Sequence, residues 1–338
     1  MKVLTPFALL AVATGSAADS PRFAAAQDLT VEKTLSSRVE LELVDGVMRA
    51  GGSDDPVPDG FELKIVHTRS LEVTDLYATV GEDGLRRIER TYDEITGGFD
   101  ADVVEDGDPE DEVRETFASD LAGEGVAWTW NSDEEAWVAT SLDEDDPLDA
   151  DLLDALHFDY DGLALLPDRE VGVGDTWIID APQLASILGL GADLELEAQG
   201  NDLADDIVPA VMCATPAQAT DTLSGEVVAT YVELVEDGGR FARIVLSGEV
   251  TASGDASEQM LRYNDQLDAD ESLQEARITT SIDLEGELLW DLASGHIRSL
   301  TLEGPMDLTL EAEAEERGMT MELELEFEGH GSWSCTVE

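Results

Sequence analysis

Basic residues are the first shortage in this 338-residue sequence. Lysine and arginine together number 18, whereas aspartate and glutamate number 78, which gives a formal net charge of −60. Nucleic acids and anionic membrane surfaces are themselves negative and are repelled by such a surface, so we expect neither as a partner. Two explanations of the acid excess stay open: adaptation to a salty medium, where dissolved ions screen the repulsion between carboxylates, and a role in binding cations.

Cysteine is almost absent, with Cys213 and Cys335 as the two examples. Two cysteines and four scattered histidines disfavour a zinc site. If the chain is exported, an even number of cysteines permits a disulfide bond. Cys213 precedes the first strand that we predict in the C-terminal region and Cys335 follows the last. A Cys213–Cys335 disulfide would therefore tie the ends of that region together; the alternative is two separately buried thiols.

Long apolar runs are missing as well. After residue 26, no run approaches the roughly 18 residues that a membrane-spanning helix needs. The first 26 residues are typical of an export signal: Lys2 gives a positive start, residues 3–13 are apolar, and Ala24-Ala25-Ala26 provides small residues for cleavage, with Ser16-Ala17-Ala18 as an earlier alternative. No cysteine follows either site, so no lipid anchor is expected. We predict a soluble protein without a transmembrane segment, exported to the periplasm or beyond the cell.

The sequence motifs of common enzymes are not found. There is no G-x-S-x-G, no G-x-G-x-x-G, no phosphate-binding P-loop and no H-x-x-x-H pair. Acid pairs for glycoside hydrolysis can be picked anywhere among 78 acids and carry no information. We predict no enzymatic activity, no catalytic residue, no cofactor and no metal ligand. Each histidine is interpreted as a surface or turn residue: His67, His157, His296 and His330.

Three features resemble binding sites but have simpler interpretations. His157–Gly162 resembles a calcium loop, yet a histidine stands where the first acidic ligand belongs, and Asp168 stands where a bidentate glutamate is usual. The acids of residues 143–146 could hold a cation loosely, but such a run is more typical of a solvated loop. Four tryptophans are more typical of a hydrophobic core than of a ligand cleft: Trp128, Trp130, Trp137 and Trp177.

What the sequence has in abundance is alternation. From Met319 to Glu328, apolar side chains alternate with polar or acidic ones. Side chains of a strand point in turn to its two faces, so this pattern puts the apolar groups on one face and the carboxylates on the other. Residues 300–314 and 278–290 repeat the pattern. The links between these stretches, Asp291–Gly295 and Glu315–Gly318, are short and end in glycine, as hairpin loops do.

This pattern predicts a mainly β fold built from long antiparallel meander sheets with a few short helices; residues 112–121 have modest helical character. The apolar face must be covered by curling, by a helix or by a second sheet, which allows a curved sheet, a half-barrel or a sandwich. We divide the chain into a signal peptide (1–26), an N-terminal β-rich region with short helices (27–200), a linker (201–220) and a C-terminal β-meander domain (221–338). One continuous curved sheet is the alternative to two β-rich parts.

One stretch carries a resemblance. Leu166-Pro167 precedes residues 171–177, which read Val-Gly-Val-Gly-Asp-Thr-Trp. This Leu-Pro…Val-x-Val-Gly-Asp-x-Trp motif resembles one found in exported bacterial proteins of unknown function. Arg86-Arg87 with the residues that follow it, and the strand ending at Asp291, are similar to other parts of these proteins. The resemblance implies secretion and a β-rich fold, and it implies no activity.

These observations favour an exported non-catalytic structural or interaction protein, whose partner would be another envelope protein. The alternative from another class is a carrier whose curved sheet holds an apolar ligand such as a lipid acyl chain, because leucine and methionine crowd the inward face. A third class, a hydrolase, would require acids or a nucleophile that converge in one pocket, which the sequence does not reveal.

Overall fold

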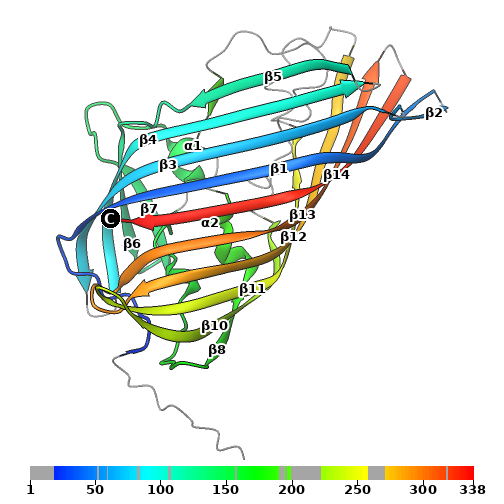
Figure 1. Ribbon diagram of the computed structural model, residues 1–338. Coiled ribbons are helices and arrows are strands. Elements are labelled where there is room, and N and C mark those ends of the chain that lie inside the picture. The colour runs from blue at the N-terminus through cyan, green and yellow to red at the C-terminus, as the bar shows by residue number, and fades with distance from the viewer. Residues whose placement is uncertain are drawn as a thin grey trace, which may run out of the picture.

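The structure is a computed structural model that describes residues 19–51, 53–58, 60–81, 84–105, 108–156, 158–189, 194, 196–198, 222–257, 271–316 and 319–338. Within these residues the strands form one strongly curved 14-stranded sheet, shown in Figure 1. Neighbouring strands pair in antiparallel fashion. The prediction of a mainly β fold with long antiparallel strands and a few short helices is confirmed.

The elements follow one another along the chain as a series of long hairpins. The strands are β1 (Thr30–Ala50), β2 (Ser53–Pro56), β3 (Glu62–Gly81), β4 (Gly84–Glu105), β5 (Asp108–Ala118), β6 (Gly125–Asn131), β7 (Ala136–Ser141), β8 (Thr176–Asp180), β9 (Glu197–Ala198), β10 (Ser224–Glu236), β11 (Arg240–Asp255), β12 (Glu271–Asp291), β13 (His296–Glu316) and β14 (Met319–Val337). The short helices are α1 (Ala150–Ala155), η2 (Leu163–Leu165), η3 (Ala181–Leu184) and α2 (Ala185–Leu188).

The sheet joins the first and the last strand of the described residues. Its strand order is β7-β6-β4-β3-β1-β14-β13-β12-β11-β10-β8, with β2 beside β1 and β5 between β4 and β9. Strand β1 pairs with β14 from Lys33 opposite Val337 to Ala50 opposite Met321. The N-terminal and C-terminal β-rich regions expected from the sequence therefore share one sheet, which is the continuous-sheet alternative. Residues 201–220, predicted as a linker, lie outside the described residues.

Alternation sets which side chains are buried. On β13 the inward side chains of Leu300, Leu302, Met306, Leu308 and Leu310 are all between 0% and 2% exposed. The carboxylates between them face water, as the pattern predicts. At the start of β14, however, Met319 is 51% exposed. Alternation fixes the face to which a side chain points, whereas burial also needs a covering layer at that point of the strand.

One local prediction from the sequence is wrong. Residues 112–121 have helical character, but strand β5 runs from Asp108 to Ala118 and pairs with β4. Helix propensity is a weak preference of a few tenths of a kcal/mol per residue. Pairing with the free edge of the long strand β4 satisfies the backbone of this segment and overrides that preference.

Two strand glycines allow the sheet to bend sharply. A Cβ added to Gly304 on β13 would lie 2.0 Å from the carbonyl oxygen of Asp283, and one added to Gly329 on β14 would lie 1.9 Å from that of Glu40. No side chain tolerates these distances, so only glycine permits such close approach of neighbouring strands. Glycine kinks are a known source of curvature in sheets.

The segment from α1 to α2 lies on the concave side of the sheet, where Figure 1 shows the helices behind the strands. It is tied to β14, because the indole nitrogen of Trp333 donates a hydrogen bond to the carbonyl oxygen of Leu188 (3.0 Å). The helices found in the described part of the chain are all too short or too polar to cross a membrane.

Candidate functional site

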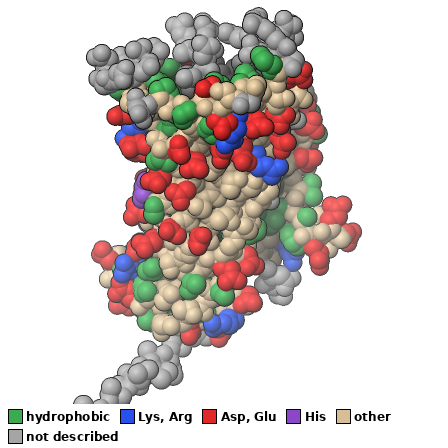
Figure 2. Space-filling model, turned by 90° about the vertical axis from the view of Figure 1, so that its right-hand side faces the viewer, with side chains coloured by type: hydrophobic (Ala, Val, Ile, Leu, Met, Phe, Trp, Pro, Cys, Tyr) green, Lys and Arg blue, Asp and Glu red, His purple; other side chains and the backbone are tan. Residues whose placement is uncertain are grey.

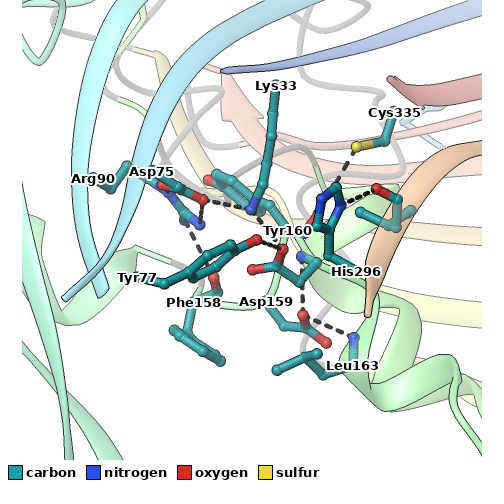
Figure 3. Close-up of polar contacts among 12 residues, drawn as sticks. Lys33, Asp75, Tyr77, Arg90, Phe158, Asp159, Tyr160, Leu163, His296 and Cys335 are labelled. Atoms are coloured by element: carbon teal, nitrogen blue, oxygen red, sulfur yellow. Dashed lines mark hydrogen bonds and ion pairs between the residues drawn. The ribbon is translucent and has the colours of Figure 1, made fainter. Parts of the chain in front are cut away.

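A cluster of ionisable side chains lies inside the molecule where the concave face meets the loop before η2 (Figure 3). Lys33 comes from β1, Asp75 and Tyr77 come from β3, Arg90 comes from β4, and Asp161 comes from the loop. The side chains of Lys33, Asp75 and Arg90 are 0% exposed, as is Asp161. We call these five residues the buried ionic cluster.

The cluster is held by short charge-assisted hydrogen bonds. The Lys33 Nζ atom lies 2.5 Å from Asp75 Oδ2 and 2.8 Å from Asp161 Oδ1. Arg90 binds Asp75 through two bonds, Nε to Oδ1 (2.8 Å) and Nη2 to Oδ2 (2.9 Å). The hydroxyl group of Tyr77 donates to Asp161. Two cations face two carboxylates, so the cluster has no net charge.

The surrounding charges keep the cluster ionised. Burial alone would raise the pKa of Asp75, but Arg90 and Lys33 hold that pKa well below its usual range. Burial alone would lower the pKa of Lys33, but Asp161 and Asp75 raise it. The pKa of Tyr77 is raised by burial and by the carboxylate of Asp161, so its hydroxyl group stays protonated and remains a donor. The pKa values of Lys33, Asp75 and Tyr77 are thus all moved away from neutral pH.

The loop that carries Asp161 is organised by Asp159. The Asp159 carboxylate accepts hydrogen bonds from the backbone N–H groups of Asp161, Leu163 and Ala164 at 2.9–3.1 Å. The loop is further tied to the sheet by Arg90, which stacks 3.9 Å from the ring centre of Tyr160. Asp159 and Asp161, two of the acids that resemble calcium ligands in the sequence, are thus used within the fold, whereas Asp168 is exposed. The described residues contain no group of acids, histidines and cysteines arranged to hold a metal ion. His157 lies outside the described residues.

The Val-x-Val-Gly-Asp-x-Trp motif forms the turn that leads into β8. Gly174 has a φ of +95° and donates its N–H to the carbonyl oxygen of Tyr231 (2.7 Å). The carboxylate of Asp175 accepts from the N–H of Gly172 (2.8 Å). The indole of Trp177 donates to the carbonyl oxygen of Leu165 (2.9 Å), which ties β8 to η2. The motif residues therefore have structural roles in this chain.

The other tryptophans and the three described histidines are parts of the core or of strand faces. Trp137 stacks on Phe158 with ring centres 4.0 Å apart, and Trp128 is 4% exposed. His67 packs against Phe99 with ring centres 5.0 Å apart. His296 on β13 is half-buried, and His330 on β14 is exposed.

Of the two cysteines predicted to pair, the structure describes Cys335. The sulfur atom of Cys335 is buried on β14, 3.8 Å from the carbonyl oxygen of Tyr160, and burial raises the pKa of the Cys335 thiol to about 12. Cys213 lies outside the described residues, so the Cys213–Cys335 disulfide stays a prediction.

A second candidate site lies on the outer face of the sheet. An open groove with a volume of about 520 Å³ crosses five neighbouring strands: β4, β3, β1, β14 and β13. Its lining is rich in residues whose hydroxyl groups are on the outer face: Ser36, Thr68, Ser70, Thr96, Thr301, Ser332 and Ser334. We call this feature the hydroxyl groove. It exists because a row of small side chains lies between strand segments that carry long acidic ones.

Strand register produces the hydroxyl groove. Ser334 lies opposite Ser36, Ser36 opposite Ser70, and Ser70 opposite Thr96. The hydroxyl groups of Ser36 and Ser334 are 2.8 Å apart and hydrogen-bonded. Arg38 at the groove is paired with Glu40 (2.6 Å) and, through that bond, lowers the pKa of the Glu40 carboxyl. Figure 2 shows carboxylates spread over the face of the molecule seen there, with few basic side chains among them.

Sequence reasoning missed both sites. The signal for the ionic cluster was present: Lys33 stands between Val31 and Leu35, and Asp75 between Val73 and Tyr77, so each charge falls on the apolar face of its strand. A charge on the inward face must be paired, because an isolated buried charge is very costly. For the hydroxyl groove no local signal exists, since its row is assembled from five strands.

Comparison with known proteins does not assign the chain to a family. No protein-family model matches the chain, and no curated protein matches it. Among solved structures, one similar chain is an outer membrane channel from Pseudomonas putida F1, with 8% sequence identity and a TM-score of 0.21, covering 93% of this chain and 97% of that one. Similarity at this level carries no argument about function.

Proposed function

We propose that this protein is an exported, non-catalytic interaction protein that contacts its partner through the hydroxyl groove. The observation that carries this proposal is the row of small hydroxyl side chains across five strands of the outer face. Export is supported by the signal-like pattern of the first residues.

The absence of a catalytic role is supported by the state of the buried ionic cluster. Its charged side chains are 0% exposed and neutralise one another. A general acid or base must reach a substrate and have a pKa near the working pH. In this cluster the pKa of Asp75 is lowered and the pKa of Lys33 is raised, so both residues keep their charged forms. The cluster therefore holds the loop against the sheet.

The chemistry of the groove favours an uncharged, hydroxyl-rich ligand such as a neutral glycan. Serine and threonine hydroxyls both donate and accept hydrogen bonds, which matches the hydroxyl groups of a sugar. The net charge of −60 repels anionic polymers. Arg38 already binds Glu40, so the groove offers no uncommitted positive charge at that position.

The test is binding of neutral oligosaccharides, with glucose oligomers of different linkage as probes and an acidic uronate oligomer as a contrast, measured by calorimetry. Wild-type protein is expected to bind at least one neutral oligomer, and Ser70→Glu is expected to weaken that binding about tenfold or more. Ser247→Glu, on the outer face of β11 away from the groove, is the matched control. No binding of any neutral oligomer at about 10 mM, or equal binding by Ser70→Glu, would contradict the proposal.

Catalysis is tested separately with chromogenic esters, phosphate esters and glycosides. We expect no turnover above that of the buffer. Turnover that follows the protein through every purification step, and that is lost in Lys33→Met, would show that the cluster is reactive and overturn the non-catalytic role.

A carrier is the second candidate, favoured by the apolar inward face. The inward residues of the sheet at the end remote from the cluster are aliphatic or aromatic and at most 1% exposed: Leu41, Ile65, Phe99, Leu308 and Phe327. Mass spectrometry of an organic extract of the purified protein tests this candidate. A lipid that is present in a fixed ratio to protein supports it, and the absence of any such lipid removes it.

A further inference from the structure

The beginning of the described chain is part of the folded protein. Residues 19–29 run across the ends of the strands, as the dark-blue segment of Figure 1 shows. Ser20, Pro21 and Ala25 are buried. The expected export signal has two sites for cleavage, after Ala26 or after Ala18. Cleavage after Ala26 would remove this buried segment, whereas cleavage after Ala18 would keep all of it.

Trp290 on β12 depends directly on this segment. Its side chain is 0% exposed, and its indole nitrogen donates to the carbonyl oxygen of Arg22 (3.1 Å). An indole N–H can only donate, and a buried donor without an acceptor is strongly unfavourable. Loss of residues 19–26 would take the acceptor of Trp290 away.

The backbone of the segment is also fixed. The N–H of Ala24 donates to the carbonyl oxygen of Gly295 (2.8 Å), in the turn between β12 and β13. Gly295 has a φ of +70°, and a Cβ added to it would lie 2.6 Å from the backbone nitrogen of Ala24. Position 295 therefore requires glycine for two reasons. Its φ is positive, and the backbone of the N-terminal segment lies where a side chain would be.

Side chains of the segment reach three further parts of the molecule. The hydroxyl oxygen of Ser20 accepts from the N–H of Val171 (3.0 Å), within the Val-x-Val-Gly-Asp-x-Trp motif. Phe23 packs edge-on against Tyr77 of the ionic cluster, with ring centres 5.6 Å apart. Asp19 forms an ion pair with Arg240 at the start of β11.

We propose that export processing cuts the peptide bond between Ala18 and Asp19, and that Asp19–Ala26 is a structural part of the mature protein. This proposal rests on the proposed export of the chain. The reaction is hydrolysis by an export peptidase. Water adds across the bond, so that its hydroxyl group joins the carbonyl carbon of Ala18 and a hydrogen joins the nitrogen of Asp19. Ala18 leaves with a new carboxylate, and Asp19 gains a free α-amino group.

The first experiment is production of the full chain in a bacterium that exports proteins, followed by intact mass and N-terminal sequencing of the exported fraction. A mature protein that begins at Asp19 is expected. One that begins at Gln27 would overturn the processing site while leaving export intact. A chain that stays uncut in the cytoplasm would overturn export, and with it the processing site.

Two matched variants locate the cut by an independent measurement. Ala18→Leu puts a bulky side chain where the peptidase requires a small one, so uncut precursor is expected to accumulate. Ala26→Leu makes the same change at an exposed position beside the other site, and normal processing is expected. The reverse pattern would contradict the proposal.

The structural role is tested with two proteins made without export, one that begins at Asp19 and one that begins at Gln27, each after an initiating methionine. The shorter protein is expected to unfold about 3–6 °C lower or more, because it lacks the acceptor of Trp290 and the contacts of Ser20 and Ala24. Equal unfolding temperatures would show that the segment does not stabilise the fold.

Discussion

Arg90 on β4 binds Asp75 on β3 through two hydrogen bonds of 2.8 and 2.9 Å in the interior of the protein. The same arginine donates to the carbonyl oxygen of Phe158 (3.2 Å), and the same aspartate accepts from Lys33 on β1. This pair therefore connects three neighbouring strands with the loop before η2.

Removal of the negative charge of Asp75 should destabilise the protein strongly. Asp75→Asn leaves the buried cations Lys33 and Arg90 facing Asp161 alone, and breaking a buried ion pair costs about 3–5 kcal/mol. Urea unfolding at fixed high salt measures the change. Glu42→Gln removes one partner of the exposed Lys64–Glu42 pair (3.0 Å) and should cost less than about 1 kcal/mol. Equal costs for the two variants would show that the buried cluster does not stabilise the fold.

The same pair should give a pH dependence in the acid range. The pKa of Asp75 in the folded protein is about 2, below the unfolded value of about 3.9. The stability that the Asp75 carboxylate contributes is therefore present above pH 4 and is lost as the pH falls towards 2. The stability difference between wild type and Asp75→Asn should shrink over that range. Taking the difference cancels the effect of the many surface carboxylates, and a difference that stays constant from pH 5 to about 2.5 would contradict the assignment.

Salt should stabilise this protein. Four exposed acids lie directly opposite one another across four strands, Asp180, Glu226, Glu249 and Asp283. Like charges at directly opposed positions of a sheet are unfavourable, and dissolved salt screens them. The unfolding temperature should rise with potassium chloride concentration.

Substitution in the middle of this row separates the local repulsion from other effects of salt. Glu249→Lys should raise the unfolding temperature at low salt by about 1–3 °C, Glu249→Gln by less, and both effects should fade at about 1 M salt. A lysine that lowers the unfolding temperature at low salt would show that the acidic row binds a specific cation.

The β8 edge of the sheet is blocked against further pairing. Arg169 donates to the carbonyl oxygen of Thr176 (3.0 Å), and the side chain of Gln183 accepts from the N–H of Asp180 (3.1 Å). Between them Ile178 is 59% exposed, beside Val228 on β10. Free sheet edges with exposed apolar residues pair with other chains, and side chains that occupy the edge prevent this.

The double variant Arg169→Ala with Gln183→Ala should therefore self-associate at high salt, where charge repulsion is screened. Light scattering coupled to size-exclusion chromatography measures the mass. Arg277→Ala, on the central strand β12, removes a cation without opening an edge, and its mass in solution should equal that of the wild type. If both variants associate equally, loss of positive charge and not the edge is the cause.

Local chemistry made much of the sheet predictable. The turn at residues 291–295 was predicted from its glycine, and in the structure Asp291 accepts from the N–H groups of Ala293 and Ser294 while Gly295 takes a positive φ. The inward face of β13 follows directly from the two-residue period of its leucines. Both features depend on residues that are neighbours in the chain.

The sequence by itself thus determined that the protein is made of long strands with one apolar and one acidic face, and where its hairpins turn. The tertiary structure alone decided that Lys33 on β1 lies opposite Val337 on β14, and that Asp161 reaches Lys33 across 128 positions of sequence. Alternation repeats every two residues and looks alike on every strand, so it cannot specify which distant strands meet. That choice is made when the curved sheet closes around its buried charges, because each charge is tolerated only beside its partner.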